Sequence, residues 1–144
     1  MVSAGLVASA LIIGLTACVD GPSAGESADR LSAALKSAGA GIERAEVVRT
    51  PSFAGGLTIS LTVSSESLDP TGDQVKTGTL KSILTVTADN SDDMKVTNLY
   101  VYADDESGSD VSFHDAATEL GLENSLKGDS LTLVAEDWTS FARK

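Results

Sequence analysis

The stretch LTISLTVS, residues Leu57–Ser64, alternates apolar and polar side chains without a break. Successive side chains of a β-strand point to opposite faces of a sheet, so this pattern predicts a strand with one buried side. Upstream, Ile42–Arg49 is a second strand candidate, which Pro51 ends, and Gly55-Gly56 marks a turn between the two. Together these features predict a β-hairpin with a loop of about seven residues.

Two later stretches also have strand character, Val96–Ala103 and Leu131–Ala135. The first alternates between an apolar face and a face that carries Tyr100 and Tyr102. The segment Asp104–Ser109 follows it with acidic and small polar residues, which predict a solvated turn.

Helices are predicted for Ser27–Ala38, Asp73–Asp89 and Asp110–Leu120. The first and third carry apolar residues at positions i, i+3, i+4 and i+7, which form one helical stripe. The second is ambiguous, because Thr85–Thr87 favour a strand. The adjacent apolar pair Ile83-Leu84 breaks strand alternation and favours a helix, whereas a strand there would make the sheet a simple meander.

The elements follow in the order α-β-β-α-β-α-β, and Asp137 is a candidate cap for a terminal turn that carries Trp138 and Phe141. This order predicts an α+β fold, a two-layer sandwich in which a roughly four-stranded sheet has helices on one face. A chain of 144 residues has room for one such domain.

The composition excludes some classes of partner. The formal net charge is -11, from 21 acidic and 10 basic side chains. Binding to DNA, RNA or anionic lipid headgroups needs clustered Lys and Arg, so the sequence predicts no nucleic-acid partner. A single cysteine cannot form an intrachain disulfide.

The N-terminal segment differs from the rest. Residues 1–17 contain no Asp, Glu, Lys, Arg or His, and Leu6–Leu15 is a run of apolar or small side chains. A bilayer-spanning helix needs roughly 20 apolar residues, whereas the apolar region of a signal peptide is about 7–15 residues long. The run therefore favours a signal peptide.

The four residues Leu15-Thr16-Ala17-Cys18 end this run and resemble the lipobox of bacterial lipoproteins, in which an aliphatic residue and two small residues precede cysteine. The resemblance implies that the Cys18 thiol receives a diacylglyceryl group and that a peptidase cuts between Ala17 and Cys18. It further implies a signal peptide over residues 1–17, a flexible tether over 18–26 and an extracytoplasmic domain over 27–144. In its Ala-, Gly- and Asp-rich style the chain is similar to small lipoproteins of high-GC Gram-positive bacteria.

Gly21–Gly25 also matches G-x-S-x-G, the consensus of a hydrolase nucleophile turn. That turn must join a buried strand to a helix, and no strand precedes it here. We interpret the segment as part of the flexible tether.

The candidates for catalysis and metal binding are weak. His114 is the single histidine, and on a helix the adjacent Asp115 is expected to point about 100° away from it. A calcium loop with Gly108 at its sixth position would place Ala103 first, where an acidic ligand is required. One histidine does not supply enough ligands for a zinc site, since the single cysteine is expected to carry the lipid. The sequence therefore predicts no catalytic, cofactor-binding or metal-binding residue.

Aromatic side chains are scarce, and Tyr100 and Tyr102 share one strand face. If helices cover the opposite face, these two residues look outward from the open side of the sheet and offer a surface for a ligand or partner. The alternative is that they pack across strands against β-branched neighbours. Phe53 and Trp138 are further candidates for such a face.

Together these patterns predict a lipid-anchored protein on the extracytoplasmic face of the cell membrane, with a non-catalytic domain that binds an envelope protein or a small ligand. Two alternatives remain open. One is an accessory or structural subunit of a membrane complex, and the other is an envelope hydrolase.

Overall fold

The alternating stretch forms the second strand of a mixed five-stranded sheet in a computed structural model that describes residues 24–50 and 55–142. The strand order is β1-β2-β3-β5-β4. The strands are β1 (Ile42–Thr50), β2 (Gly56–Val63), β3 (Asn98–Asp105), β4 (Leu126–Lys127) and β5 (Ser130–Val134). The helices are α1 (Ala24–Ser37), α2 (Thr77–Asn90), α3 (His114–Glu119) and α4 (Ala135–Thr139), with short 3₁₀ turns at Ser65–Ser67, Asp92–Met94 and Glu123–Ser125.

The predicted hairpin is confirmed. β1 and β2 pair antiparallel, with Ala45 opposite Leu61 and Val47 opposite Ile59. The alternation works as expected, because Leu57, Ile59, Leu61 and Val63 are all buried on one side. β2 then pairs parallel with β3, and such a pairing needs a crossover connection, which α2 supplies.

The ambiguous segment is a helix, as predicted. Leu80, Ile83 and Leu84 are fully buried along one side of α2, and the Thr87 hydroxyl donates to the Ile83 carbonyl at 2.7 Å. The helix begins at Thr77 rather than Asp73 because the backbone before it is engaged elsewhere. The Val75 N–H donates to the Ser112 carbonyl at 2.9 Å, and the Ser112 N–H donates to the Asp73 carbonyl at 2.8 Å.

The third helix was predicted over Asp110–Leu120 but begins only at His114. The residues before it are held in an extended segment beside the end of β3. The Val111 N–H donates to the Ala103 carbonyl at 3.0 Å, and the Phe113 N–H donates to the Asp129 carbonyl at 3.1 Å. These long-range bonds take the donors and fix the backbone that a helix would need.

The α+β class is confirmed, but the prediction of four strands is wrong. Leu126–Lys127 forms a fifth strand, which pairs antiparallel with Leu131 and Ser130 of β5.

Asp137, the predicted cap of the last helical turn, is the third residue of α4 rather than the residue before the helix. Its carboxylate oxygen accepts the Val134 N–H at 3.3 Å, so it caps the helix from inside the first turn.

The first helix starts at Ala24, so Gly25 and Glu26 belong to it and not to a tether that ends at residue 26. The Ser27 hydroxyl donates to Asp93 at 2.8 Å, and the Arg30 guanidinium also donates to Asp93 at 2.9 Å, which ties α1 to the turn after α2. None of the helices in the described ranges is long and apolar enough to cross a membrane.

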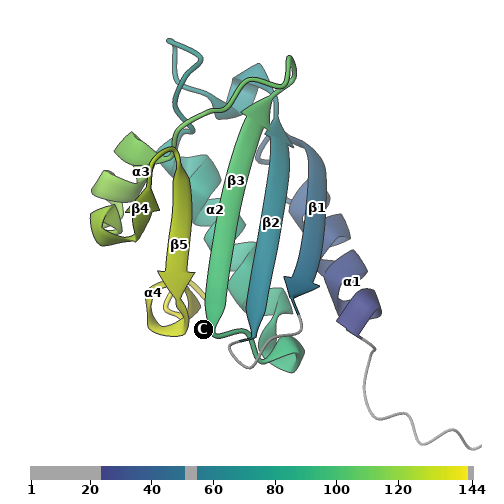
Figure 1. Ribbon diagram of the computed structural model, residues 1–144. Coiled ribbons are helices and arrows are strands. Elements are labelled where there is room, and N and C mark those ends of the chain that lie inside the picture. Colours follow the sequence, from purple (N-terminus) through teal and green to yellow (C-terminus); the bar gives the residue numbers. More distant parts are fainter. Residues whose placement is uncertain (1–23, 51–54, 143–144) are drawn as a thin grey trace, which may run out of the picture.

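Figure 1 shows α1 and α2 behind the sheet, whereas no helix crosses the front of β1, β2 and β3. The core lies between the sheet and these helices, where Leu31, Leu35, Phe113 and Leu133 are fully buried. One sheet face is thus covered, and we call the other the open face.

Candidate functional site: the open face of the sheet

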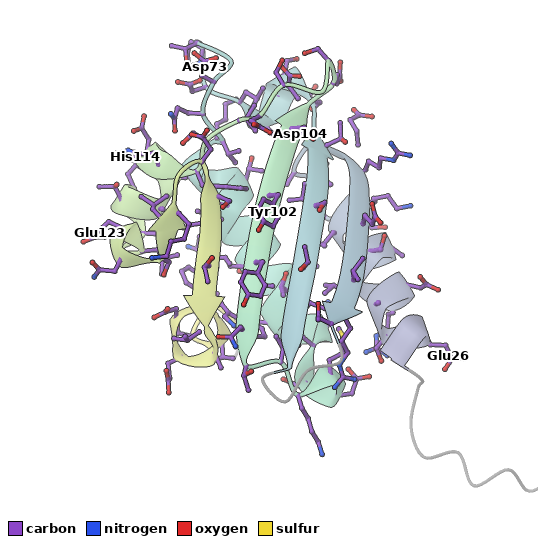
Figure 2. The ribbon with its side chains drawn as sticks, in the orientation of Figure 1. Glu26, Asp73, Tyr102, Asp104, His114 and Glu123 are labelled. Atoms are coloured by element: carbon purple, nitrogen blue, oxygen red, sulfur yellow. The ribbon has the colours of Figure 1, made fainter. Side chains whose placement is uncertain are left out.

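The open face carries Tyr100 and Tyr102, as the strand pattern predicted. Tyr100 lies opposite Thr58 of β2 and Thr132 of β5, and Tyr102 lies opposite Ser60 of β2. Paired residues of neighbouring strands present their side chains on the same face. Figure 2 shows Tyr102 in the middle of this face and Asp104 nearer the end of β3.

Large apolar side chains gather on this face. Among the described residues, those that remain exposed are Val48 at 48%, Tyr102 at 47% and Val134 at 45%. Val48 lies opposite Thr58, which itself lies opposite Tyr100, and Val134 lies opposite Asn98 of β3. All three therefore belong to the open face, in three different strands.

The two tyrosines differ in their surroundings. Tyr100 is half-buried, and its ring covers Gly56, where a Cβ atom would lie 3.5 Å from a ring carbon and 3.7 Å from Thr50. Tyr100 thus packs across strands, as the alternative interpretation predicted. Tyr102 is exposed, so it is the tyrosine that is free to contact a partner.

A hollow of about 210 Å³ opens beside Tyr102. We call it the Tyr102 hollow. It is lined by Tyr102 and Ala103 of β3, by Asp110 and Val111 of the extended segment, and by Lys127, Asp129 and Ser130 of the β4–β5 turn. Elements from three parts of the chain therefore converge there.

Two carboxylates are forced together at the edge of this hollow. Asp104 and Asp110 are directly opposite one another in an antiparallel bridge at the end of β3. Burial first, and then the neighbouring Asp110 carboxyl, raises the pKa of Asp104 above its ordinary value. Like charges placed opposite each other destabilise a sheet, and here the turn geometry imposes that arrangement.

Replacing Asp104 with asparagine is expected to stabilise the fold at neutral pH. Because folding raises the pKa of Asp104, the charged carboxylate costs stability once the pH exceeds the folded-state pKa. Asp104→Asn should raise the free energy of unfolding at pH 7 by about 0.5 kcal/mol. The gain should disappear well below pH 3.8, where the carboxyl is protonated in both states, and thermal unfolding followed by circular dichroism checks both points.

Asp105→Asn is the matched control, because folding lowers the pKa of Asp105 whereas it raises the pKa of Asp104. The Ser107 hydroxyl and the Ser107 and Ser109 N–H groups donate to its carboxylate at 2.6, 2.8 and 3.0 Å. These bonds, the Ser107 hydroxyl first, lower the pKa of Asp105, so its charge contributes stability that is lost as the pH falls. Asp105→Asn should therefore destabilise at pH 7. Equal stabilisation by both variants would show only a relief of overall charge.

His114 does not lie where the sequence placed it relative to Asp115. The imidazole Nδ1 is 3.3 Å from an Asp115 carboxylate oxygen, rather than pointing away from it. Both residues are in the first turn of α3 and are exposed, so their side chains bend toward each other along the surface. The Ser112 hydroxyl accepts the His114 backbone N–H at 3.1 Å, so these three residues do not form a Ser-His-Asp relay.

The acidic turn shows no calcium loop. The Asp105 carboxylate accepts hydrogen bonds from its own turn, as described above. Within residues 24–50 and 55–142, no group of three or more His, Cys, Asp or Glu side chains could hold a metal ion.

The other predicted site residues have varied outcomes. Trp138 is buried and packs into the core, so its assignment to a binding face is wrong. Ala17, Cys18 and Phe53 lie outside the described residues, as do the first three residues of the G-x-S-x-G match. Gly25, which ends that match, lies in the first turn of α1.

The sequence did not point to three residues of the Tyr102 hollow: Asp110, Lys127 and Asp129. A signal existed for Asp129, because Gly128-Asp129 is a two-residue pair typical of a hairpin turn. Nothing in the sequence placed that turn beside Tyr102.

No protein-family model matches this chain, and the searches of curated proteins and of solved structures gave no match. The function must therefore be inferred from the residues of the chain itself.

Proposed function

We propose that this protein is a lipoprotein held at the extracytoplasmic face of the cell membrane by a diacylglyceryl group on Cys18. Its folded domain serves as a non-catalytic binding module of the cell envelope. The open face of the sheet is the surface through which it binds a partner, which is a protein rather than a nucleic acid.

The anchor is supported by the order of features in the sequence. An uncharged run of apolar and small residues leads directly into Leu15-Thr16-Ala17-Cys18, and the described fold begins at Ala24. The five residues between Cys18 and Ala24 span at most roughly 20 Å, even when fully extended. Two acyl chains on Cys18 supply the two hydrophobic anchors that stable membrane attachment needs.

One observation carries the binding role. The exposed large apolar side chains of the described residues, Val48, Tyr102 and Val134, all lie on the one sheet face that no helix covers. They lie on three different strands, and their shared position on an uncovered face supports a contact surface. The Tyr102 hollow adds polar groups beside one of them.

Site-specific photocrosslinking in intact cells tests the binding role. A photoreactive phenylalanine analogue is placed in turn at Val48, Tyr102 and Val134. The same analogue is placed at Ala33 of α1 and Lys81 of α2, which are exposed on the helical side. We expect the three open-face positions to form a crosslink to the same envelope protein, and the two helical positions to form none.

Crosslinks that are equally frequent from both sides would contradict the proposal, because they would reflect random encounters. Absence of any crosslink from the open face would contradict it as well. A crosslink to a stable membrane complex would identify the partner as the assembly in which this protein serves as an accessory subunit.

A further inference from the structure

The Tyr102 hollow holds more negative than positive charge. Asp110 and Asp129 line it together with Lys127, and Asp104 lies directly opposite Asp110. Burial, and then the neighbouring Asp110 carboxyl, raises the pKa of Asp104. A cation supplied from outside would relieve this repulsion, because an opposite charge stabilises the ionised form of both carboxyls.

The size of the hollow favours a single side chain over a free small molecule. Its volume is about 210 Å³, whereas small-molecule pockets are typically about 300–1,000 Å³. The ring of Tyr102 borders it and is 47% exposed. An aromatic face attracts an ammonium or guanidinium group in addition to the carboxylates.

Two further exposed apolar side chains, Val134 and Val48, lie on the same face at some distance from the hollow. Val134 lies opposite Asn98, four residues before Tyr102 on β3, which places it roughly 13 Å away along the strand. Val48 lies two strands away from Tyr100, or roughly 10 Å. Val48 lies on β1, whereas the hollow and Val134 lie toward β5. An extended peptide presents residues i, i+2 and i+4 on one side over roughly 13 Å, so a short segment laid along β3 can reach the hollow and Val134 together.

The position of the hollow leaves it accessible. Figure 1 shows the start of α1 at the end of the sheet where β3 begins, and Figure 2 shows Asp104 toward the opposite end. The hollow therefore lies toward the end of the sheet away from the start of α1.

We propose that the open face docks an extended basic segment of a partner protein, with one arginine or lysine side chain in the Tyr102 hollow and an apolar side chain on Val134. This inference rests on the proposed binding role of the open face and names the chemistry of its partner.

Charge argues against the other occupants of this face. A second copy of the chain carries the same net charge of -11 and is repelled. Nucleic acid and anionic lipid are repelled for the same reason. On β1, Arg44 and Glu46 also lie on the open face, and their opposite charges cancel. The carboxylates at the hollow therefore make the charge of this face negative.

Peptide binding to the full-length lipidated chain in detergent micelles tests the inference. The probe is a fluorescent nine-residue peptide in which arginine and valine alternate with serine, and a second probe replaces each arginine with glutamate. Fluorescence anisotropy should detect binding of the arginine peptide alone. Tyr102→Ala should weaken that binding by about fivefold, and Asp110→Asn by about threefold.

Glu123→Gln is the matched control. It removes one negative charge, as Asp110→Asn does, from an exposed turn on the far side of α3, which Figure 2 labels. Its binding should equal that of the native chain, and circular dichroism should show all three variants folded.

The inference is overturned by three results. These are no binding of the arginine peptide, equal binding of the glutamate peptide, or equal weakening by Glu123→Gln and Asp110→Asn. Self-association of the native chain that Tyr102→Ala abolishes, measured by analytical ultracentrifugation, would assign the face to a second copy instead. If the open face crosslinks to a protein in cells but the arginine peptide does not bind, this inference fails and the proposed function stands.

Discussion

Replacing Phe113 with alanine is expected to lower the free energy of unfolding by about 3–5 kcal/mol. The side chain is fully buried in the hydrophobic core, and it is one of the largest there. Its removal loses apolar contact and leaves a cavity that the sheet and helices cannot close. Because domains of this size are stable by about 5–15 kcal/mol, urea denaturation should show a large shift of the midpoint.

Tyr102→Ala is the control for this result. It truncates a similar ring that is 47% exposed on the open face. A surface substitution of this kind should change the free energy of unfolding by only about 0.5 kcal/mol. If Phe113→Ala costs no more than Tyr102→Ala, the core does not lie between the sheet and the helices as described.

Replacing Cys18 with alanine is expected to lower the membrane-bound fraction by at least about tenfold after an alkaline carbonate wash. The variant has no thiol to accept a diacylglyceryl group. The apolar run Leu6–Leu15 that it would retain is half the length that a bilayer span requires. Immunoblots of washed membranes and of the supernatant measure the effect, and metabolic labelling with an alkyne fatty acid should mark the native chain but not Cys18→Ala.

Val19→Ala is the matched control, since it changes the neighbouring residue and keeps the thiol. It should remain membrane-bound and labelled. Equal retention of the native chain and Cys18→Ala, without fatty-acid label on either, would contradict the anchor.

Local sequence patterns predicted the strands and helices that have one side buried in the core and the other side exposed to solvent. Leu57–Val63 alternates because one side of β2 faces the helices and the other faces solvent. The pair Ile83-Leu84 indicates a helix, because two adjacent residues can both face the core in a helix, whereas in a half-buried strand they point to opposite faces. In these cases, burial of one side stabilises the element and also requires apolar residues at a regular spacing, which makes the element recognisable in the sequence.

Tertiary hydrogen bonds decided the elements that the patterns missed. The apolar stripe that begins at Phe113 gave the correct buried side of α3 but the wrong start. Bonds from Val111 to Ala103 and from Phe113 to Asp129 hold the preceding residues extended. β4 is only two residues long, which is too short to show strand alternation in the sequence. It is recognised as a strand only because it pairs with β5.

The proposed binding surface could also be predicted only in part. Strand alternation placed Tyr100 and Tyr102 on the outward face, and that part of the site could be predicted. The Tyr102 hollow could not, because Asp110 and Asp129 reach Tyr102 through two turns whose paths the sequence does not encode locally. Asp104 was assigned to a solvated turn, whereas it lies within β3, which continues to Asp105, and is half-buried opposite Asp110.

The attachment of the protein to the membrane is tested most directly by intact-mass spectrometry of the native chain, extracted with detergent from the membranes of its own host. We predict a chain that begins at Cys18 and carries the added mass of a diacylglyceryl group. A chain that still includes residues 1–17, or one that begins elsewhere with an unmodified Cys18, would contradict the lipid anchor.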